Sequence, residues 1–173
     1  MNGNEMIEKI KNKELEIISD LSLEYRLVNY LIENKLTIST AESCTGGMIM
    51  STLINVPGAS KVINEGYITY STESKMRILG VVKSTVDEYS VYSKEVALQM
   101  ALGVLKNSKA DIVVSVTGLT DSSGGVFDYC IIYNNRPYLY NYTVYGERNE
   151  IRSKQTRIIL WTILEILGVK NDI

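Results

Sequence analysis

The sequence predicts an α/β protein, a three-layer α/β/α sandwich with a mixed sheet that forms a single domain. Segments of strand-like composition alternate with segments whose apolar residues recur at helical spacing. Two adjoining strand-like segments near the C-terminus are typical of a hairpin, which makes the sheet mixed. The 173 residues suffice for one domain of ordinary size, and no linker rich in glycine, serine or proline divides them.

The order of the elements follows from apolar periodicity and from residues that start or stop helices. Leu23, Leu27 and Leu31 recur at helical spacing, whereas residues 111–117 are rich in β-branched side chains. The expected elements are, in order, helices over 1–18 and 22–34, a strand over 36–40, a loop over 41–47, a helix over 48–55, a strand over 62–70, a helix over 72–79, a helical turn from 84, a helix over 93–107, a strand over 111–117, a polar loop over 118–125, strands over 126–133 and 138–145, and a helix over 147–167.

Capping residues mark several helix starts. Ser71 or Thr72 is expected to cap the helix after the second strand, and Ser93 the long helix that follows later. Thr85 and Glu88 have the spacing of a capping box, which predicts the short helical turn between those helices. Residues 1–20 are expected to form an N-terminal helical extension of the domain.

The composition excludes several classes of function. The chain has no histidine, which rules out Ser-His-Asp and Cys-His catalysis. Cys44 and Cys130 are too few for a Cys-only zinc site, so we expect no metal and no cofactor. A net charge of -2 lacks the basic excess of a nucleic-acid binder. No apolar run is long enough for a membrane span and the N-terminus is charged, so we expect a cytoplasmic protein that contacts no membrane.

The most specific local feature is the segment Thr40–Gly47, TAESCTGG, between an expected strand and an expected helix. Its two glycines allow the backbone to turn tightly and to approach a ligand closely. Free N–H groups at the start of the following helix favour an anion such as phosphate. Ser43 and Thr45 offer hydroxyls, and Cys44 offers a thiol. The pattern fits a ligand site, and it equally fits a plain tight turn with a hydroxyl cap.

A second cluster lies where the next strand gives way to a helix. Tyr70 ends the strand, and Lys75 follows in the first turns of the helix. If the two strands are neighbours, both side chains can reach Ser43. A desolvated lysine beside a serine hydroxyl makes a nucleophile without histidine. The alternative is a lysine exposed on the helix surface, which is common for a lone lysine.

Together these motifs resemble the CinA C-terminal domain family, the competence/damage-inducible proteins. The resemblance rests on AESCTGG, VPGAS, GYITYSTESK, ILGV, the pattern S-K-E-V-A-L-x-M-A and SVTG, and it runs from about Leu27 to Leu167. It implies an α/β/α fold for a single domain over residues 1–173. It also implies an amidohydrolase of pyridine nucleotide metabolism, which cleaves the carboxamide of nicotinamide mononucleotide (NMN) to nicotinate mononucleotide and ammonia.

The resemblance also assigns roles to residues of this chain. The family's serine nucleophile falls on Ser43, its lysine on Lys75 and its tyrosine on Tyr70. In the implied reaction Ser43 attacks the carboxamide, Lys75 takes its proton, and Tyr70 orients or relays. Backbone N–H groups around residues 45–47 would stabilise the oxyanion or a ligand phosphate. The expected substrate-binding residues are Glu42, Thr45, Gly46, Gly47, Thr117, Gly118, Arg148 and Arg152.

One stretch departs from the family pattern. The family usually has V-T-G-I-A-G-P-x-G-G and then a loop with K-P-V-G, whereas residues 120–122 of this chain replace A-G-P and the K-P-V-G loop is missing. Thr72 replaces the usual asparagine of Y-S-N-E-x-K. We therefore expect a shortened substrate loop. The alternative function is a non-catalytic nucleotide-binding or regulatory protein on the same scaffold.

The expected partners follow from the C-terminal part of the chain. Arg148 and Arg152 lie four residues apart on one helix face, where they could hold a phosphate or pair with Glu147 and Glu150. The tyrosine-rich hairpin carries only Arg136, which favours a sheet face or a subunit interface over a nucleic-acid surface. We expect a small pyridine nucleotide as ligand, a homodimer or higher homo-oligomer, and no nucleic acid.

Overall fold

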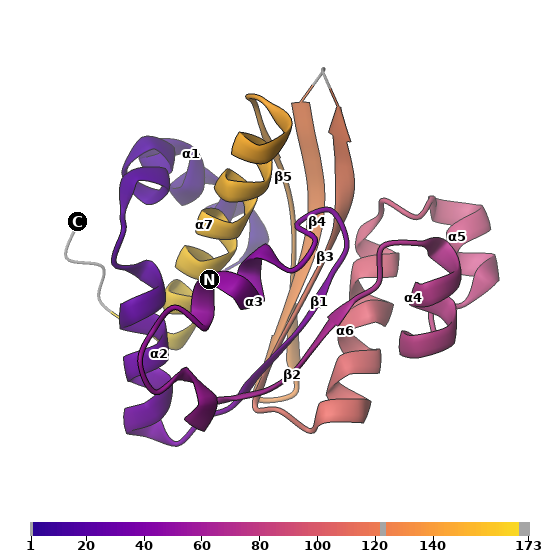
Figure 1. The fold of residues 1–173 in the computed structure, drawn as a ribbon. Helices are drawn as coiled ribbons and strands as arrows, with labels where there is room; N and C mark the ends of the chain where they lie inside the picture. Colours follow the sequence, from indigo (N-terminus) through magenta and orange to yellow (C-terminus); the bar gives the residue numbers. More distant parts are fainter. Residues whose placement is uncertain (1, 122–123, 170–173) are drawn as a thin grey trace.

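The computed structural model describes residues 2–121 and 124–169 and consists of a sheet between two layers of helices (Figure 1). The strands are β1 (Ile38–Glu42), β2 (Ile63–Ile68), β3 (Ile112–Asp121), β4 (Gly124–Tyr133) and β5 (Arg136–Val144). They form a five-stranded sheet in the order β2-β1-β3-β4-β5. The first three strands of this order are parallel, and β4 and β5 are antiparallel to their neighbours. This arrangement confirms the predicted α/β/α sandwich with a mixed sheet.

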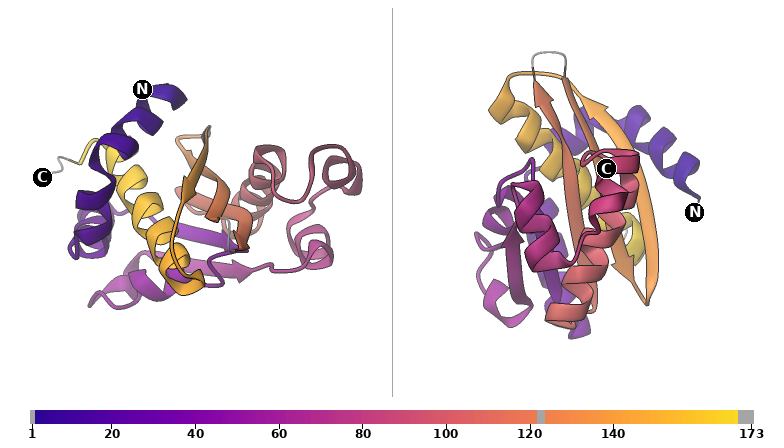
Figure 2. Two further views of the ribbon diagram at one scale, coloured as in Figure 1. Left: turned by 90° about the horizontal axis from the view of Figure 1, so that it is seen from above. Right: turned by 90° about the vertical axis from the view of Figure 1, so that its right-hand side faces the viewer.

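Helices cover both faces of the sheet (Figures 1 and 2). They are α1 (Gly3–Ser19), α2 (Leu23–Asn34), α3 (Met48–Leu53), α4 (Thr72–Leu79), α5 (Lys83–Tyr89), α6 (Lys94–Ser108) and α7 (Arg148–Leu167), with a short 3-10 helix at Ala59–Lys61. On one face, α7 packs on the sheet and is flanked by α1, α2 and α3. On the other face, α6 packs on the sheet, and α4 and α5 pack against α6.

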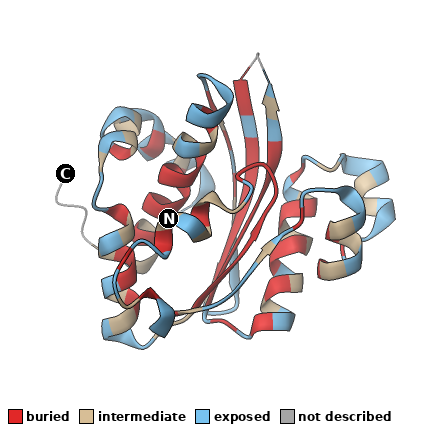
Figure 3. Ribbon diagram, in the orientation of Figure 1, coloured by how far each residue is buried: buried red, intermediate tan, exposed pale blue. Residues whose placement is uncertain are grey.

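Two hydrophobic cores lie on the two faces of the sheet. Residues of β3 alternate between them: Val114 belongs to the core under α7, and Val113 belongs to the core under α6. Trp161 of α7 and Met100 of α6 are buried in these respective cores. Figure 3 shows the buried residues along the strands and on the sides of α6 and α7 that face them. Because helices cover both faces, a central strand is apolar on both sides, which explains its continuous run of β-branched residues.

The connections around β1 leave a crevice at the carboxyl ends of the parallel strands. The chain passes from β1 to β2 through α3 on one face of the sheet, and from β2 to β3 through α4, α5 and α6 on the other. Such a change of face between neighbouring parallel strands opens a crevice beyond their carboxyl ends, where ligands bind in open α/β sheets. In register, Glu42 at the end of β1 lies between Ile68 of β2 and Val116 of β3.

The polar loop predicted over residues 118–125 is instead the end of a β-hairpin. Gly118 pairs with Phe127, and Asp121 pairs with Gly124, so β3 and β4 continue well beyond the predicted strand ends. The small polar residues of this stretch carry a weak local preference for a strand, and the antiparallel partner supplies the hydrogen bonds that decide its conformation. Residues 122 and 123 lie outside the described residues.

The predicted capping box at Thr85 and Glu88 is also wrong. The short helix α5 begins at Lys83, and the hydroxyl of Thr85 accepts a hydrogen bond from the Gln99 side chain of α6 at 2.8 Å. A contact from a distant helix therefore replaces the local cap. By contrast, the caps predicted at Ser71 and Ser93 are confirmed, since each hydroxyl accepts an N–H from the first turn of its helix.

Strands β1, β2 and β5 also depart from their predicted bounds by up to two residues, and β2 ends at Ile68 rather than at residue 70. The first strand covers Ile38–Glu42 rather than residues 36–40, and β5 begins at Arg136 rather than at residue 138. The β4–β5 turn consists of Asn134 and Asn135, whose φ angles are 51° and 57°. Asparagine tolerates this left-handed conformation, which lets a two-residue turn match the twist of its strands.

The N-terminal helix α1 is an integral part of the hydrophobic core. Its residues Met6, Ile10 and Ile17 are fully buried, and the helix packs on α7 and β5. The Tyr142 hydroxyl of β5 donates a hydrogen bond to Glu14 at 2.5 Å. Among residues 2–121 and 124–169, no helix combines the length and apolar character needed to cross a bilayer.

We predict that Ile10→Ala lowers the free energy of unfolding by about 2–5 kcal/mol, because it leaves a cavity between α1, α7 and β5. Leu15→Ala on the same helix is the matched control, since Leu15 is 84% exposed. It should change stability by less than about 0.5 kcal/mol. Urea denaturation measures both. Equal stability of the two variants would contradict a contribution of Ile10 to the core.

Candidate active site

Ser43 lies in a tight turn directly after β1. Its N–H donates to the Val116 carbonyl of β3 at 3.1 Å, and its carbonyl accepts the Gly46 N–H at 3.0 Å. Gly46 and Gly47 have φ angles of 60° and 92°, in the left-handed region that favours glycine. The glycines therefore serve the turn, as predicted. The Gly46 N–H, which we expected to face a ligand, is donated within the turn.

Lys75 reaches Ser43 from the neighbouring strand–helix connection. Its Nζ lies 2.9 Å from Ser43 Oγ, 2.8 Å from the Thr69 carbonyl oxygen and 3.1 Å from the Tyr70 carbonyl oxygen. The residue is only 1% exposed, so it is not the surface lysine of the alternative interpretation. Burial lowers the pKa of the Lys75 amine to about 8.

The contacts of Lys75 suit it to accept a proton from Ser43. A neutral amine has two N–H donors and one lone pair. If the carbonyls of Thr69 and Tyr70 take the two N–H groups, the lone pair faces Ser43 Oγ. A serine hydroxyl with a base at hydrogen-bonding distance is an activated nucleophile.

The neighbouring thiol of Cys44 is poorly suited to the same role. Burial raises the pKa of Cys44 to about 12. The thiolate is the nucleophilic form of cysteine, and this environment disfavours it at neutral pH. Of the two side chains, Ser43 is therefore the one with a base in place.

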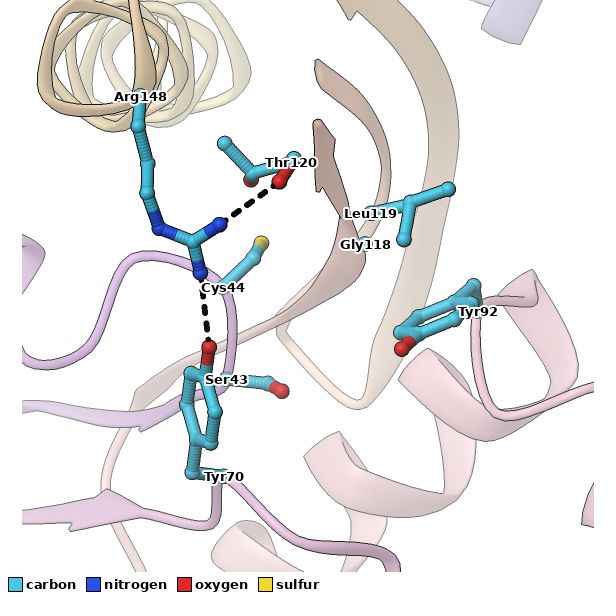
Figure 4. Close-up of a pocket in the computed structure, with 8 residues that line it drawn as sticks. All are labelled: Ser43, Cys44, Tyr70, Tyr92, Gly118, Leu119, Thr120 and Arg148. Carbon is cyan, nitrogen blue, oxygen red and sulfur yellow. Dashed lines mark hydrogen bonds between the residues drawn. The ribbon is translucent and has the colours of Figure 1, made fainter. Parts of the chain in front are cut away.

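A cavity of about 170 Å³ opens onto Ser43 (Figure 4). It is lined by Ser43, Cys44, Tyr70, Tyr92, Gly118, Leu119, Thr120 and Arg148. Cavities that enclose drug-sized ligands usually measure about 300–1,000 Å³. This one therefore has room for the reacting end of a nucleotide-sized ligand, with the remainder lying outside. Two lining residues were not predicted: Tyr92 belongs to no motif, and Leu119 takes the isoleucine position of the family's V-T-G-I-A-G-P.

Arg148 borders the cavity at the start of α7. Its Nη1 donates to the Thr120 carbonyl at 2.9 Å, and its Nη2 donates to the Tyr70 hydroxyl at 3.1 Å (Figure 4). The expected alternative partner Glu150 forms an ion pair with Lys154 at 2.6 Å instead. The Tyr70 hydroxyl thus accepts a hydrogen bond from Arg148. The contact of Tyr70 with Lys75 is made by its backbone carbonyl.

Arg152, one turn further along α7, hydrogen-bonds to the backbone of the turn that contains Ser43. Its Nε and Nη2 both donate to the Thr45 carbonyl, at 3.2 and 2.8 Å, and its Nη1 donates to Asn149 at 3.1 Å. Each of its three nitrogens thus has a protein acceptor. These contacts fit a residue that fixes the turn better than one that grips a phosphate.

Glu42 occupies the start of α3, where we expected a ligand anion. Its buried carboxylate accepts the Thr45 hydroxyl at 2.7 Å and the N–H groups of Ile49 and Met50 at 3.0 and 2.9 Å. The expectation of free N–H groups at this helix start therefore fails for these two amides, because the chain supplies its own anion. Glu42 and Thr45 support the turn from inside the protein.

The remaining predicted residues lie on β3. Gly118 lines the cavity, and a Cβ at this position would lie 2.5 Å from the Val126 carbonyl oxygen of β4. The Thr117 hydroxyl points away toward the α5–α6 loop and donates to the Val91 carbonyl at 2.9 Å. Among the residues that the structure describes, no cluster of three or more His, Cys, Asp or Glu side chains could hold a metal.

The predicted residues thus form two groups. One group comprises Ser43, Tyr70, Gly118 and Arg148, which line the cavity, and Lys75, which contacts Ser43. The other supports the turn or the adjoining loop and comprises Glu42, Thr45, Gly46, Gly47, Thr117 and Arg152.

Known proteins are similar in sequence to this chain over most of its length. Residues 20–167 match the model of the CinA C-terminal domain. A CinA-like protein of Kosmotoga olearia is 40% identical over 150 residues, covering 83% of this chain and 36% of the relative. A CinA-like protein of Petrotoga mobilis is 36% identical over 179 residues, covering 96% of this chain and 44% of the relative. The chain spans 26% to 44% of the length of these and six further curated relatives.

Solved structures of related proteins have a similar fold. The competence/damage inducible protein CihA of Agrobacterium tumefaciens superposes with a TM-score of 0.78 at 30% identity, over 85% of this chain and 94% of that one. A competence-damaged protein (CinA) superfamily protein of Escherichia coli superposes with a TM-score of 0.78 at 27% identity, over 83% of this chain and 88% of that one.

We predict that Glu42→Ala lowers the free energy of unfolding by about 2 kcal/mol or more, because it leaves buried donors without an acceptor. Glu42→Gln keeps one acceptor oxygen and should lose less. Glu16→Ala, at an exposed position of α1, is the control for removing a carboxylate and should be close to wild type. Denaturation curves compare the three variants. A Glu42→Ala protein as stable as Glu16→Ala would contradict the supporting role of this carboxylate.

Proposed function

We propose that this chain, which belongs to the CinA C-terminal domain family, hydrolyses the carboxamide of NMN to nicotinate mononucleotide and ammonia. Membership of the family is consistent with a hydrolase. The observation that carries the proposal is the contact of 2.9 Å between Ser43 Oγ and Lys75 Nζ at the cavity. The proposed roles are nucleophile for Ser43 and general base for Lys75.

In the first half of the proposed reaction, Ser43 Oγ attacks the carboxamide carbon while its proton passes to Lys75 Nζ. The C–O bond forms, and the carbonyl π electrons move to the oxygen of a tetrahedral intermediate. When this intermediate collapses, the C–N bond breaks, and the Lys75 ammonium returns the proton to the leaving nitrogen. Ammonia departs, and the nicotinate moiety remains as an ester of Ser43.

In the second half, a water molecule attacks the ester carbon and passes a proton to Lys75. Collapse of the second intermediate breaks the C–O bond to Ser43, and the serine oxygen recovers its proton from Lys75. The acid product leaves, and the pair returns to its initial state. Lys75 acts alternately as base and acid, which a pKa of about 8 suits better than an ordinary lysine pKa near 10.4.

Arg148 is the proposed partner of the ligand phosphate. Its guanidinium borders the cavity, and its two acceptors there, the Thr120 carbonyl and the Tyr70 hydroxyl, are uncharged. A guanidinium with neutral acceptors retains its attraction for a phosphate, to which it can donate two parallel hydrogen bonds. Since the cavity encloses the reacting end, the phosphate would lie at its mouth, on the side of α7.

We predict that Ser43→Ala lowers the rate of ammonia release from NMN by about 10⁴-fold or more, and that Lys75→Ala loses nearly as much, because the two residues act as a unit. Cys44→Ala is the matched neighbour and should keep most of the activity. The assay contains a chelator, since the proposed reaction uses no metal. An active Ser43→Ala with an inactive Cys44→Ala would move the nucleophile to Cys44. A well-folded wild-type protein that releases no ammonia would favour the alternative nucleotide-binding role.

We predict that the rate rises with pH through a single ionisation near pH 8, the pKa to which burial lowers Lys75. The sign follows from the roles: the protonated amine cannot accept the Ser43 proton, so activity is low below this pKa and levels off above it. Single-turnover rates from about pH 6 to about pH 10 measure the profile while the chemical step is limiting. A flat profile over this range would argue against Lys75 as the base.

A further inference from the structure

We propose that Tyr92 is a substrate-binding residue, with its phenol ring forming the wall of the cavity opposite Tyr70 and Arg148. This inference rests on the proposed function, because it assigns the ring of the carboxamide substrate to the space that Tyr92 borders. Figure 4 shows Tyr92 on one side of the cavity and the pair Tyr70 and Arg148 on the other, with Ser43 between them.

The backbone around Tyr92 is held in place on both sides. The preceding carbonyl, of Val91, accepts the Thr117 hydroxyl of β3 at 2.9 Å. The following residue, Ser93, caps α6 and donates from its hydroxyl to the Ser90 carbonyl at 2.9 Å. The Tyr92 N–H donates to the Ser90 hydroxyl at 3.3 Å. The ring therefore extends from a backbone that is tied to the central sheet and to α6.

The side chain itself remains available to a ligand. Tyr92 is 47% exposed, and its hydroxyl oxygen is turned toward the part of the cavity that contains Ser43 (Figure 4). A tyrosine loses little conformational entropy when a ligand covers it and offers a large contact area. Its hydroxyl can donate or accept a hydrogen bond. Tyr92 thus provides both an aromatic surface and a polar group beside the nucleophile.

The size of the cavity determines which part of the ligand Tyr92 contacts. Because about 170 Å³ accommodates only the reacting end, the ring that carries the carboxamide lies near Ser43 and Tyr92, and the phosphate lies outside near Arg148. The contribution of Tyr92 should therefore be the same for NMN and for nicotinamide riboside, which lacks the phosphate. Removing the Arg148 guanidinium should weaken binding of NMN alone.

The test compares Tyr92→Phe and Tyr92→Ala with Tyr89→Ala. Tyr89 is the matched control because it is also 47% exposed, lies three residues away on α5, and does not line the cavity. KM and kcat come from ammonia release with NMN and nicotinamide riboside. Kd for both compounds comes from calorimetry in a Ser43→Ala background, which prevents turnover. Circular dichroism and denaturation curves establish that each variant is folded.

We expect Tyr92→Phe to raise KM and Kd about 3- to 10-fold through loss of one hydrogen bond. Tyr92→Ala should raise them about 10- to 30-fold through the additional loss of aromatic contact area. For each variant the increases in KM and Kd should be equal for NMN and nicotinamide riboside. The value of kcat should change less than KM. Tyr89→Ala should match the protein with both tyrosines intact.

The outcomes separate this inference from the proposed function. If the wild-type protein releases ammonia and Tyr92→Ala has the KM and Kd of Tyr89→Ala, the role of Tyr92 is overturned and the amidohydrolase stands. A fall in kcat without a change in Kd also overturns it. If no ammonia is released but NMN binds with a Kd that depends on Tyr92, the reaction is overturned and the binding role stands. A protein that neither binds nor hydrolyses NMN overturns both.

Discussion

The amine of Lys75 lies between the ends of β1 and β2, where it hydrogen-bonds to three uncharged oxygens rather than to a carboxylate. A carboxylate neighbour would favour the charged ammonium and raise its pKa, whereas burial beside neutral dipoles favours the neutral amine. Two of the three oxygens are backbone carbonyls of the segment that leaves β2. The parallel register of β1 and β2 therefore decides both where the amine lies and how readily it holds a proton.

The groups that line the cavity differ from those that hold the Ser43 turn in place. Glu42 and Arg152 hold the turn through different groups of Thr45: Glu42 accepts the Thr45 hydroxyl and an N–H at the start of α3, and Arg152 of α7 donates to the Thr45 carbonyl. Thr45 is fully buried between them. This arrangement fixes Ser43 through its neighbours, so the serine hydroxyl itself is left to Lys75 and the cavity.

The sequence predicted the layers of the fold, because apolar periodicity and helix caps are strong local signals. The contact of Ser43 with Lys75 was expected only on the condition that their two strands are neighbours, and from the resemblance to the family. The pairing of β1 with β2 meets that condition. Prediction from the sequence failed where residues far away in the chain determine the local conformation. The residues from Gly118 to Asp121 form a strand because β4 pairs with them, and Gln99 replaces the expected cap at Thr85. Tyr92 could not be identified from sequence, because a single tyrosine in a loop carries no motif and only the fold brings it to Ser43.

Most of the polar contacts that position the basic side chains of the site end on backbone oxygens. Arg148 binds the carbonyl of Thr120, Arg152 that of Thr45, and Lys75 those of the two residues after β2. A carbonyl persists whatever side chain its residue carries, so substitutions in these segments leave the acceptors in place as long as the backbone path is kept. The positions of these three basic side chains therefore depend on the backbone path of the surrounding segments more than on the side chains that those segments carry.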